Sequence, residues 1–114
     1  LHYSPYVAKA MAYMEQHYAE IVYITDVAGQ VGLNEDYLGH IFKNETGVTI
    51  NQFLNNTRMN RAIWLLNNTR LKTYEIAYKV GYANSGYFSK LFKQKFRVSP
   101  YEFRNLHERK DSCS

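Results

Sequence analysis

The sequence contains the same pattern twice, and this internal repeat is what most limits how the chain can fold. Residues 28–53 are similar to residues 77–103. Ala28, Val31 and Gly32 correspond to residues 49 positions later. After the glycine the second copy has one extra residue, so the offset becomes 50 for the pairs Tyr37/Tyr87, Leu38/Phe88, Ile41/Leu91, Phe42/Phe92, Lys43/Lys93, Val48/Val98, Thr49/Ser99 and Phe53/Phe103. A chain of 114 residues therefore holds two small related units.

Apolar residues recur every three or four positions, which predicts an all-α fold. Ser4 and Pro5 are typical of a helix start, and glycines are expected to end several of the helices. We expect about seven helices: one from Pro5, then 25–31, 35–46, 50–67, 74–80 and 85–96, with a last turn from Pro100. These helices form a first helix-turn-helix subdomain (1–48), a linker helix (49–69), a second subdomain (70–106) and a polar tail (107–114).

Each copy has the pattern of a helix-turn-helix, which is a short helix, a glycine turn and a second helix with apolar anchors. Ala28 and Ala77 are small enough to let the two helices approach closely, and Gly32 and Gly81 allow the backbone to reverse. The alternative is a repeat of plain helical hairpins, as in a helical scaffold. In either case the second helix is expected to turn one row of residues toward the core: Tyr37, Leu38, Ile41, Phe42, Tyr87, Phe88, Leu91 and Phe92. The eleven tyrosines are expected to be mostly packing residues.

Charge is distributed unevenly along the chain. Residues 1–48 carry two Lys or Arg against six acidic residues, whereas residues 49–114 carry twelve against four. A basic half of this strength favours a polyanionic partner such as nucleic acid, although a charged solvated surface is the simpler alternative.

Several functional classes lack their characteristic residues. The chain has one cysteine, Cys113, and four scattered histidines, so no metal site and no cofactor are expected. No Ser/His/Asp set, carboxylate pair or glycine-rich phosphate loop is present, so the chain is not expected to be an enzyme. No signal peptide or apolar run long enough for a membrane span is visible, so we expect a cytoplasmic protein without a membrane partner.

The second copy resembles the C-terminal helix-turn-helix of the arabinose-regulator (AraC/XylS) family. The matching residues are Ile76, Ala77, Val80, Gly81, Tyr87, Phe88, Phe92, Lys93, Ser99, Pro100 and Arg104, together with Arg58, Ala62, Leu65 and Leu66 in the linker helix. Three residues depart from the family pattern. Tyr82 replaces Phe, Arg97 replaces a glycine, and Thr73 stands at an apolar position, where we interpret it as a helix cap. If Arg97 adopts the left-handed conformation of that glycine, the cost is about 1 kcal/mol.

The resemblance implies a bacterial transcription regulator, associated with the nucleoid, that binds promoter or operator double-stranded DNA sequence-specifically. It implies RNA polymerase as a further partner and no small-molecule ligand in this domain. It also implies an effector or dimerisation domain that lies outside these residues.

A helix-turn-helix inserts its second helix into the major groove. The candidates for base contacts are therefore Glu35, Asp36, Gly39 and His40 in the first copy and Asn84, Ser85, Gly86, Ser89 and Lys90 in the second. The candidates for phosphate contacts are Lys43, Arg58, Lys93 and Arg97, and Arg58 has a partly buried ion pair as a competing role. A linker helix of about 18 residues spans about 27 Å, so the two recognition helices are expected about 34 Å apart in adjacent major-groove segments. The rival interpretation is a helical module that binds only protein.

Overall fold

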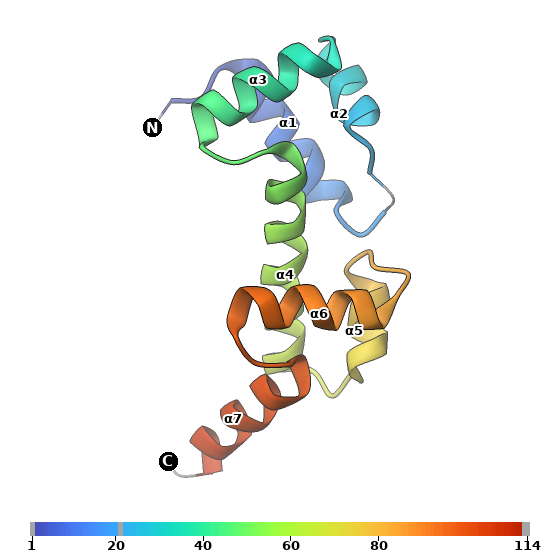
Figure 1. The fold of residues 1–114 in the computed structure, drawn as a ribbon, viewed down its shortest axis with the longest axis vertical. Coiled ribbons are helices and arrows are strands. Elements are labelled where there is room, and N and C mark those ends of the chain that lie inside the picture. Colours follow the sequence, from blue (N-terminus) through green and yellow to red (C-terminus); the bar gives the residue numbers. More distant parts are fainter. Residues whose placement is uncertain (1, 21, 113–114) are drawn as a thin grey trace. The chain divides into compact units, whose positions relative to one another are not determined.

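The computed structural model describes the backbone of residues 2–20 and 22–112 and the side chains up to Leu106. Within this part of the chain the secondary structure consists of seven α-helices and no strand. They are α1 (Pro5–His17), α2 (Ile24–Val31), α3 (Glu35–Thr46), α4 (Ile50–Asn68), α5 (Thr73–Lys79), α6 (Ser85–Phe96) and α7 (Pro100–Ser112) (Figure 1). The chain divides into two compact units, Leu1–Thr57 and Arg58–Ser114. Each unit contains one copy of the repeat, and α4 contributes its first turns to one unit and its later turns to the other.

Local capping explains where the helices of the first unit begin and end. The Ser4 hydroxyl accepts a hydrogen bond from the Val7 amide at 3.4 Å, and Pro5 is the first residue of α1. At the start of α3, the side-chain oxygen of Asn34 accepts from the Asp36 amide at 2.8 Å and the Tyr37 amide at 3.3 Å. Helix α2 ends at Gly32 in the left-handed conformation (φ 76°), as the turn of a helix-turn-helix requires.

The core of the first unit is formed by one side of each helix. Its buried residues are Val7, Ala10 and Met14 of α1, Val27, Ala28 and Val31 of α2, Leu38 and Phe42 of α3, and Ile50 and Leu54 of α4. The Phe42 and Phe53 rings meet edge to face, with centroids 5.6 Å apart. This packing leaves the opposite side of α3 without core contacts.

The second unit repeats this arrangement with larger aromatic residues. Its buried residues are Met59, Ala62, Leu65 and Leu66 of α4, Ile76, Ala77, Val80 and Tyr82 in and after α5, and Phe88 and Phe92 of α6. The Phe92 ring contacts those of Phe88, Phe96 and Phe103 at centroid distances of 4.6–5.9 Å. These contacts hold α6 against α7.

Arg104 of α7 closes the end of α4. Its guanidinium donates to the backbone carbonyl oxygens of Leu66, Thr69 and Leu71 at 3.2, 3.2 and 2.6 Å. The last carbonyls of a helix have no partner within it, and a cation at this end also interacts favourably with the helix dipole. Arg104 therefore fixes α7 to the last turn of α4 and the loop that follows.

Two predictions about local structure were wrong. The segment after Pro100 is a helix of 13 residues rather than a single turn, and its backbone stays helical through most of the expected polar tail. Cys113 lies outside the described residues. Thr73 is not a cap but the first residue of α5, and Lys72 precedes it as the N-cap. The Glu75 carboxylate accepts from the Lys72 amide at 2.9 Å and so caps the helix from its own first turn.

Candidate nucleic-acid interface

The outer side of α3 carries the four base-contact candidates of the first copy. Asp36 and His40 are exposed, whereas Glu35 and Gly39 are half-buried. The Asn44 amide lies 3.1 Å from Nε2 of His40, so an exposed pair one turn apart occupies the middle of this surface. A Cβ on Gly39 would lie 3.9 Å from the Ile24 side chain, which is ordinary contact, so the glycine is not required by packing. The helix thus presents a short polar surface around Asp36 and His40.

The corresponding side of α6 carries the candidates of the second copy, and it is more open. Asn84, Ser85, Gly86 and Lys90 are exposed, and Ser89 is half-buried. Asn84 is the N-cap of α6, and its side-chain oxygen accepts from the Tyr87 amide at 2.9 Å. A Cβ on Gly86 would lie only 3.2 Å from that oxygen, so the glycine leaves room for the cap.

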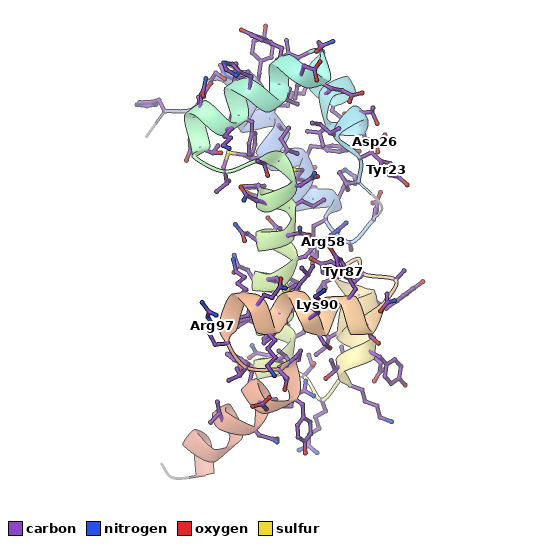
Figure 2. All side chains as sticks on the ribbon, in the orientation of Figure 1. Tyr23, Asp26, Arg58, Tyr87, Lys90 and Arg97 are labelled. Carbon is purple, nitrogen blue, oxygen red and sulfur yellow. The ribbon has the colours of Figure 1, made fainter. Side chains whose placement is uncertain are left out.

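Three of the four phosphate candidates are exposed, namely Lys43, Lys93 and Arg97. Lys93 and Arg97 form a row along α6 with Lys90 and Gln94, and these four residues line a shallow hollow of about 400 Å³. Figure 2 shows Lys90 within α6 and Arg97 at its C-terminal end. The spacing of three and four residues puts three cations on one side of one helix.

Arg97 occupies a strained backbone position. Its φ is 71°, and among the described residues it is the one non-glycine residue with a positive φ. Its amide donates to the Lys93 carbonyl at 2.8 Å, and Gly47 makes the same bond to Lys43 at 2.8 Å with a φ of 84°. Arg97 therefore adopts the left-handed conformation of the family glycine that it replaces.

Arg58 differs from the other phosphate candidates because its side chain is half-buried against an aromatic ring. The guanidinium lies 5.2 Å from the centroid of the Tyr82 ring and also hydrogen-bonds the Tyr82 hydroxyl. Burial raises the pKa of Tyr82 above its ordinary value, and the nearby Arg58 charge offsets part of that rise. The contact with Tyr82 is therefore a cation–π interaction combined with a hydrogen bond.

The expectation that tyrosines pack in the core was wrong at important positions. Tyr37 is 56% exposed and Tyr87 is 53% exposed, although both were assigned to the buried row of the recognition helices. The buried residues of that row are Leu38, Phe42, Phe88 and Phe92, with Ile41 and Leu91 half-buried. Seven of the eleven tyrosines are exposed: Tyr6, Tyr23, Tyr37, Tyr74, Tyr78, Tyr87 and Tyr101.

The two recognition helices also differ in charge. Helix α6 and its C-cap carry Lys90, Lys93, Lys95 and Arg97 without an acidic residue. Helix α3 carries three acids against Lys43 alone. One of these acids, Glu45, accepts a hydrogen bond from the Ser4 amide at 2.7 Å and therefore helps to hold the start of α1.

Two other features are absent from the described residues. No group of three or more histidine, cysteine, aspartate or glutamate side chains there is placed to hold a metal ion. None of the helices in that part of the chain has the length and apolar character needed to cross a membrane.

Comparison with known proteins gives relatives over almost the whole chain. The uncharacterized helix-turn-helix-type transcriptional regulator YisR of Bacillus subtilis is 38% identical over 102 residues, which are 90% of this chain and 36% of that protein. The chain therefore spans about a third of the length of such curated relatives. They are named as transcriptional regulators, and the chain is a domain of that kind and not an enzyme.

Solved structures show the same fold. The C-terminal domain of AraT, a response regulator from Geobacillus stearothermophilus, has a TM-score of 0.90 and 34% identity, covering 93% of this chain and 88% of that one. A transcriptional regulator from Chromobacterium violaceum, described as an AraC-type DNA-binding domain-containing protein, has a TM-score of 0.84 and 27% identity, covering 90% and 92%. A family model described as a helix-turn-helix domain matches residues 27–106, and the chain belongs to this AraC/XylS-type helix-turn-helix family.

Proposed function

We propose that this domain binds double-stranded DNA sequence-specifically on behalf of a bacterial transcription regulator, with α3 and α6 each entering a major groove. The observation that carries the proposal is the exposed side of each recognition helix. In both copies the second helix buries the matched phenylalanine, Phe42 or Phe92, and presents a polar surface on the other side. A helix placed in this way by a helix-turn-helix is the element that reads base edges.

Base contacts are proposed for the first two turns of each helix. These are Glu35, Asp36, Gly39 and His40 in α3, and Asn84, Ser85, Gly86, Ser89 and Lys90 at the start of α6. Lysine donates to guanine O6 and N7, and a carboxylate accepts from the cytosine amino group. The side-chain oxygen of Asn84 already accepts from the helix end, and we propose that its amide hydrogens make the base contact.

Phosphate contacts are proposed for Lys43, Lys93 and Arg97, whose exposed basic groups lie toward the ends of the recognition helices. Arg58 remains a candidate, although its guanidinium already contacts Tyr82. Helix α4 has 19 residues and a length of about 28 Å. Because one chain carries both recognition helices, we propose that one monomer binds an asymmetric site with two major-groove segments.

The other partners are those expected of such a regulator. Because the chain spans about a third of its curated relatives, we propose that effector sensing or dimerisation belongs to another part of the protein. RNA polymerase is the proposed protein partner, and the bacterial cytoplasm, at the nucleoid, is the proposed location.

The experiment is a measurement of duplex DNA binding by fluorescence anisotropy at several salt concentrations, after selection of preferred sites from random duplexes. Affinity should fall steeply with salt because each neutralised phosphate releases condensed counterions. Footprinting on the selected site should show two protected major-groove segments about ten base pairs apart. A module that binds only protein would show no salt-dependent affinity for DNA, and a strict requirement for a palindrome would argue for a symmetric dimer instead.

A further inference from the structure

The two copies of the repeat can be compared position by position along their recognition helices. From the N-cap to the end of the helix, residues 34–46 and 84–96, four positions carry the same residue in both copies. They are the pairs Asn34/Asn84, Tyr37/Tyr87, Phe42/Phe92 and Lys43/Lys93. The proposed base-contacting positions between them differ, as expected if each helix reads a different DNA segment.

Three of the four identities have an evident reason. The asparagines cap their helices by accepting from the backbone amides of Tyr37 and Tyr87. The phenylalanines are completely buried. The lysines are exposed beyond the base-contacting turns, where a cation meets phosphate, and phosphates are the same in every DNA sequence.

Neither helix capping nor burial in the core explains the two tyrosines. More than half of each side chain is exposed, so core packing does not require an aromatic residue there. Each tyrosine is the third residue of its recognition helix, within the turn that approaches DNA. An exposed residue that is the same in both copies, among base-contacting positions that differ, is best explained by a partner group that does not change with sequence.

We propose that the hydroxyls of Tyr37 and Tyr87 donate hydrogen bonds to DNA phosphates, one in each half of the site. The proposal rests on the proposed DNA-binding function and adds two residues to it. Tyrosine hydroxyls are among the side-chain donors that contact phosphate oxygens. The contribution of such a bond is independent of sequence because every DNA sequence has the same phosphates. It is nearly independent of salt because a neutral phenol replaces no counterion.

Tyr87 also has a support that holds its ring. Its ring meets that of Tyr82 edge to face at a centroid distance of 6.2 Å, and Tyr82 is in turn held by Arg58. Figure 2 labels Arg58 on α4 and Tyr87 at the start of α6. At the position after the turn glycine, the first copy has Leu33 in place of Tyr82. The structure thus assigns Arg58 as a positioning residue for Tyr87, acting through Tyr82.

The first test removes only the hydroxyls, with Tyr37→Phe, Tyr87→Phe and the double variant. Each single change should lower the affinity for the selected duplex and for an unrelated duplex by the same factor, about three- to tenfold. The salt slope should stay unchanged because no charge is removed, and the melting temperature should stay unchanged because both residues are more than half exposed. Tyr78→Phe, at a 79% exposed position on α5, is the matched control and should bind as the wild type does.

The outcomes separate this proposal from the proposed function. If the wild type binds duplex DNA and both phenylalanine variants bind equally well, the tyrosine contact is refuted and DNA binding stands. A loss confined to the selected duplex would refute the phosphate assignment, because it would mean that the hydroxyls read bases. If the wild type binds no duplex, it is the proposed function that fails.

The second test examines Arg58 with a double-mutant cycle. Arg58→Lys keeps the charge but loses the planar group that stacks on Tyr82. If Arg58 positions Tyr87, this change should weaken binding severalfold in the wild type and have no further effect in Tyr87→Phe. Additive effects in the cycle would overturn the positioning role, and so would full affinity with the wild-type salt slope in Arg58→Lys.

Discussion

Replacing Arg97 by glycine should make the protein more stable and weaken its binding to DNA. Arg97 closes α6 in the left-handed conformation that Gly47 adopts at the end of α3, with the same amide-to-carbonyl hydrogen bond. For a residue with a Cβ this conformation costs about 1–2 kcal/mol, and glycine avoids that cost. Part of the gain is offset because glycine loses more conformational freedom on folding. Arg97→Gly should therefore stabilise the domain by about 1 kcal/mol, a rise of several degrees in melting temperature.

The same substitution removes a proposed phosphate contact. One neutralised phosphate contributes about 0.9 to the slope of log affinity against log salt. Arg97→Gly should lower that slope by about one unit and weaken binding to all duplexes alike, which anisotropy titrations at several salt concentrations would measure. Backbone strain is often retained at functional positions, and this trade of stability for a cation would be one case.

The first copy offers a reciprocal control. A Cβ on Gly47 would meet nothing within 4 Å, so Gly47→Arg adds backbone strain and a cation without a clash. It should cost about 1 kcal/mol of stability and raise the salt slope if its side chain reaches a phosphate. Arg97→Asn, which tolerates the left-handed region but carries no charge, should resemble the glycine variant in binding. An unchanged or lower melting temperature for Arg97→Gly would refute the strain argument, and an unchanged salt slope would refute the phosphate contact.

Three further substitutions test other parts of the interface. Lys93→Ala should weaken binding to selected and unrelated duplexes about equally and lower the salt slope by about one unit; a loss confined to the selected site would contradict this. Asp36→Ala should strengthen binding to unrelated DNA and reduce the preference for the selected site by about 1–3 kcal/mol. An unchanged preference would refute the base contact and would mean that Asp36 only interacts favourably with the helix dipole. Above pH 10 an unfolded chain ionises Tyr82 while the folded state, with its raised pKa, keeps the proton, so unfolding is favoured as pH rises. Denaturant titrations should show a smaller loss of stability between pH 9 and 11 in Tyr82→Phe, and equal losses in the two proteins would contradict the raised pKa.

The helix boundaries were predictable because the signals for them are local. Ser4, Gly32 and Gly47 act through their own backbone conformation or through a bond to a residue three or four positions away. The extent of α7 was missed because residues 101–112 have no continuous apolar stripe, so periodicity gave no sign of a helix. The prediction of a cap at Thr73 was wrong because the Glu75 carboxylate, which lies inside the helix, caps its start instead.

The candidate site was predictable only in part, because exposure depends on which elements lie beside a helix. Tyr37 and Ile41 are four residues apart, as are Leu38 and Phe42, so spacing alone did not show which row is buried more deeply. Side chains lean toward the N-terminus of their helix, and a residue in the first turn therefore projects toward the helix end. The contact of Arg58 with Tyr82 joins residues 24 positions apart in sequence, and no local pattern indicates it.

The repeat separates these roles more sharply than either copy does alone. Positions that hold the fold must satisfy the same geometry in both units, and positions that contact phosphate must meet the same chemical group in both halves of a site. Positions that read bases are free of both constraints. At such positions the residue types differ between the copies, as Asp36 corresponds to Gly86 and His40 corresponds to Lys90. Arg97 and Gly47 are the exception. Both positions require a positive φ, which suits glycine, yet the second copy carries Arg97 there. Arg97 adds a cation to α6, which is already the more basic of the two recognition helices. We therefore infer that α6 supplies more of the affinity for DNA and α3 more of the sequence selectivity.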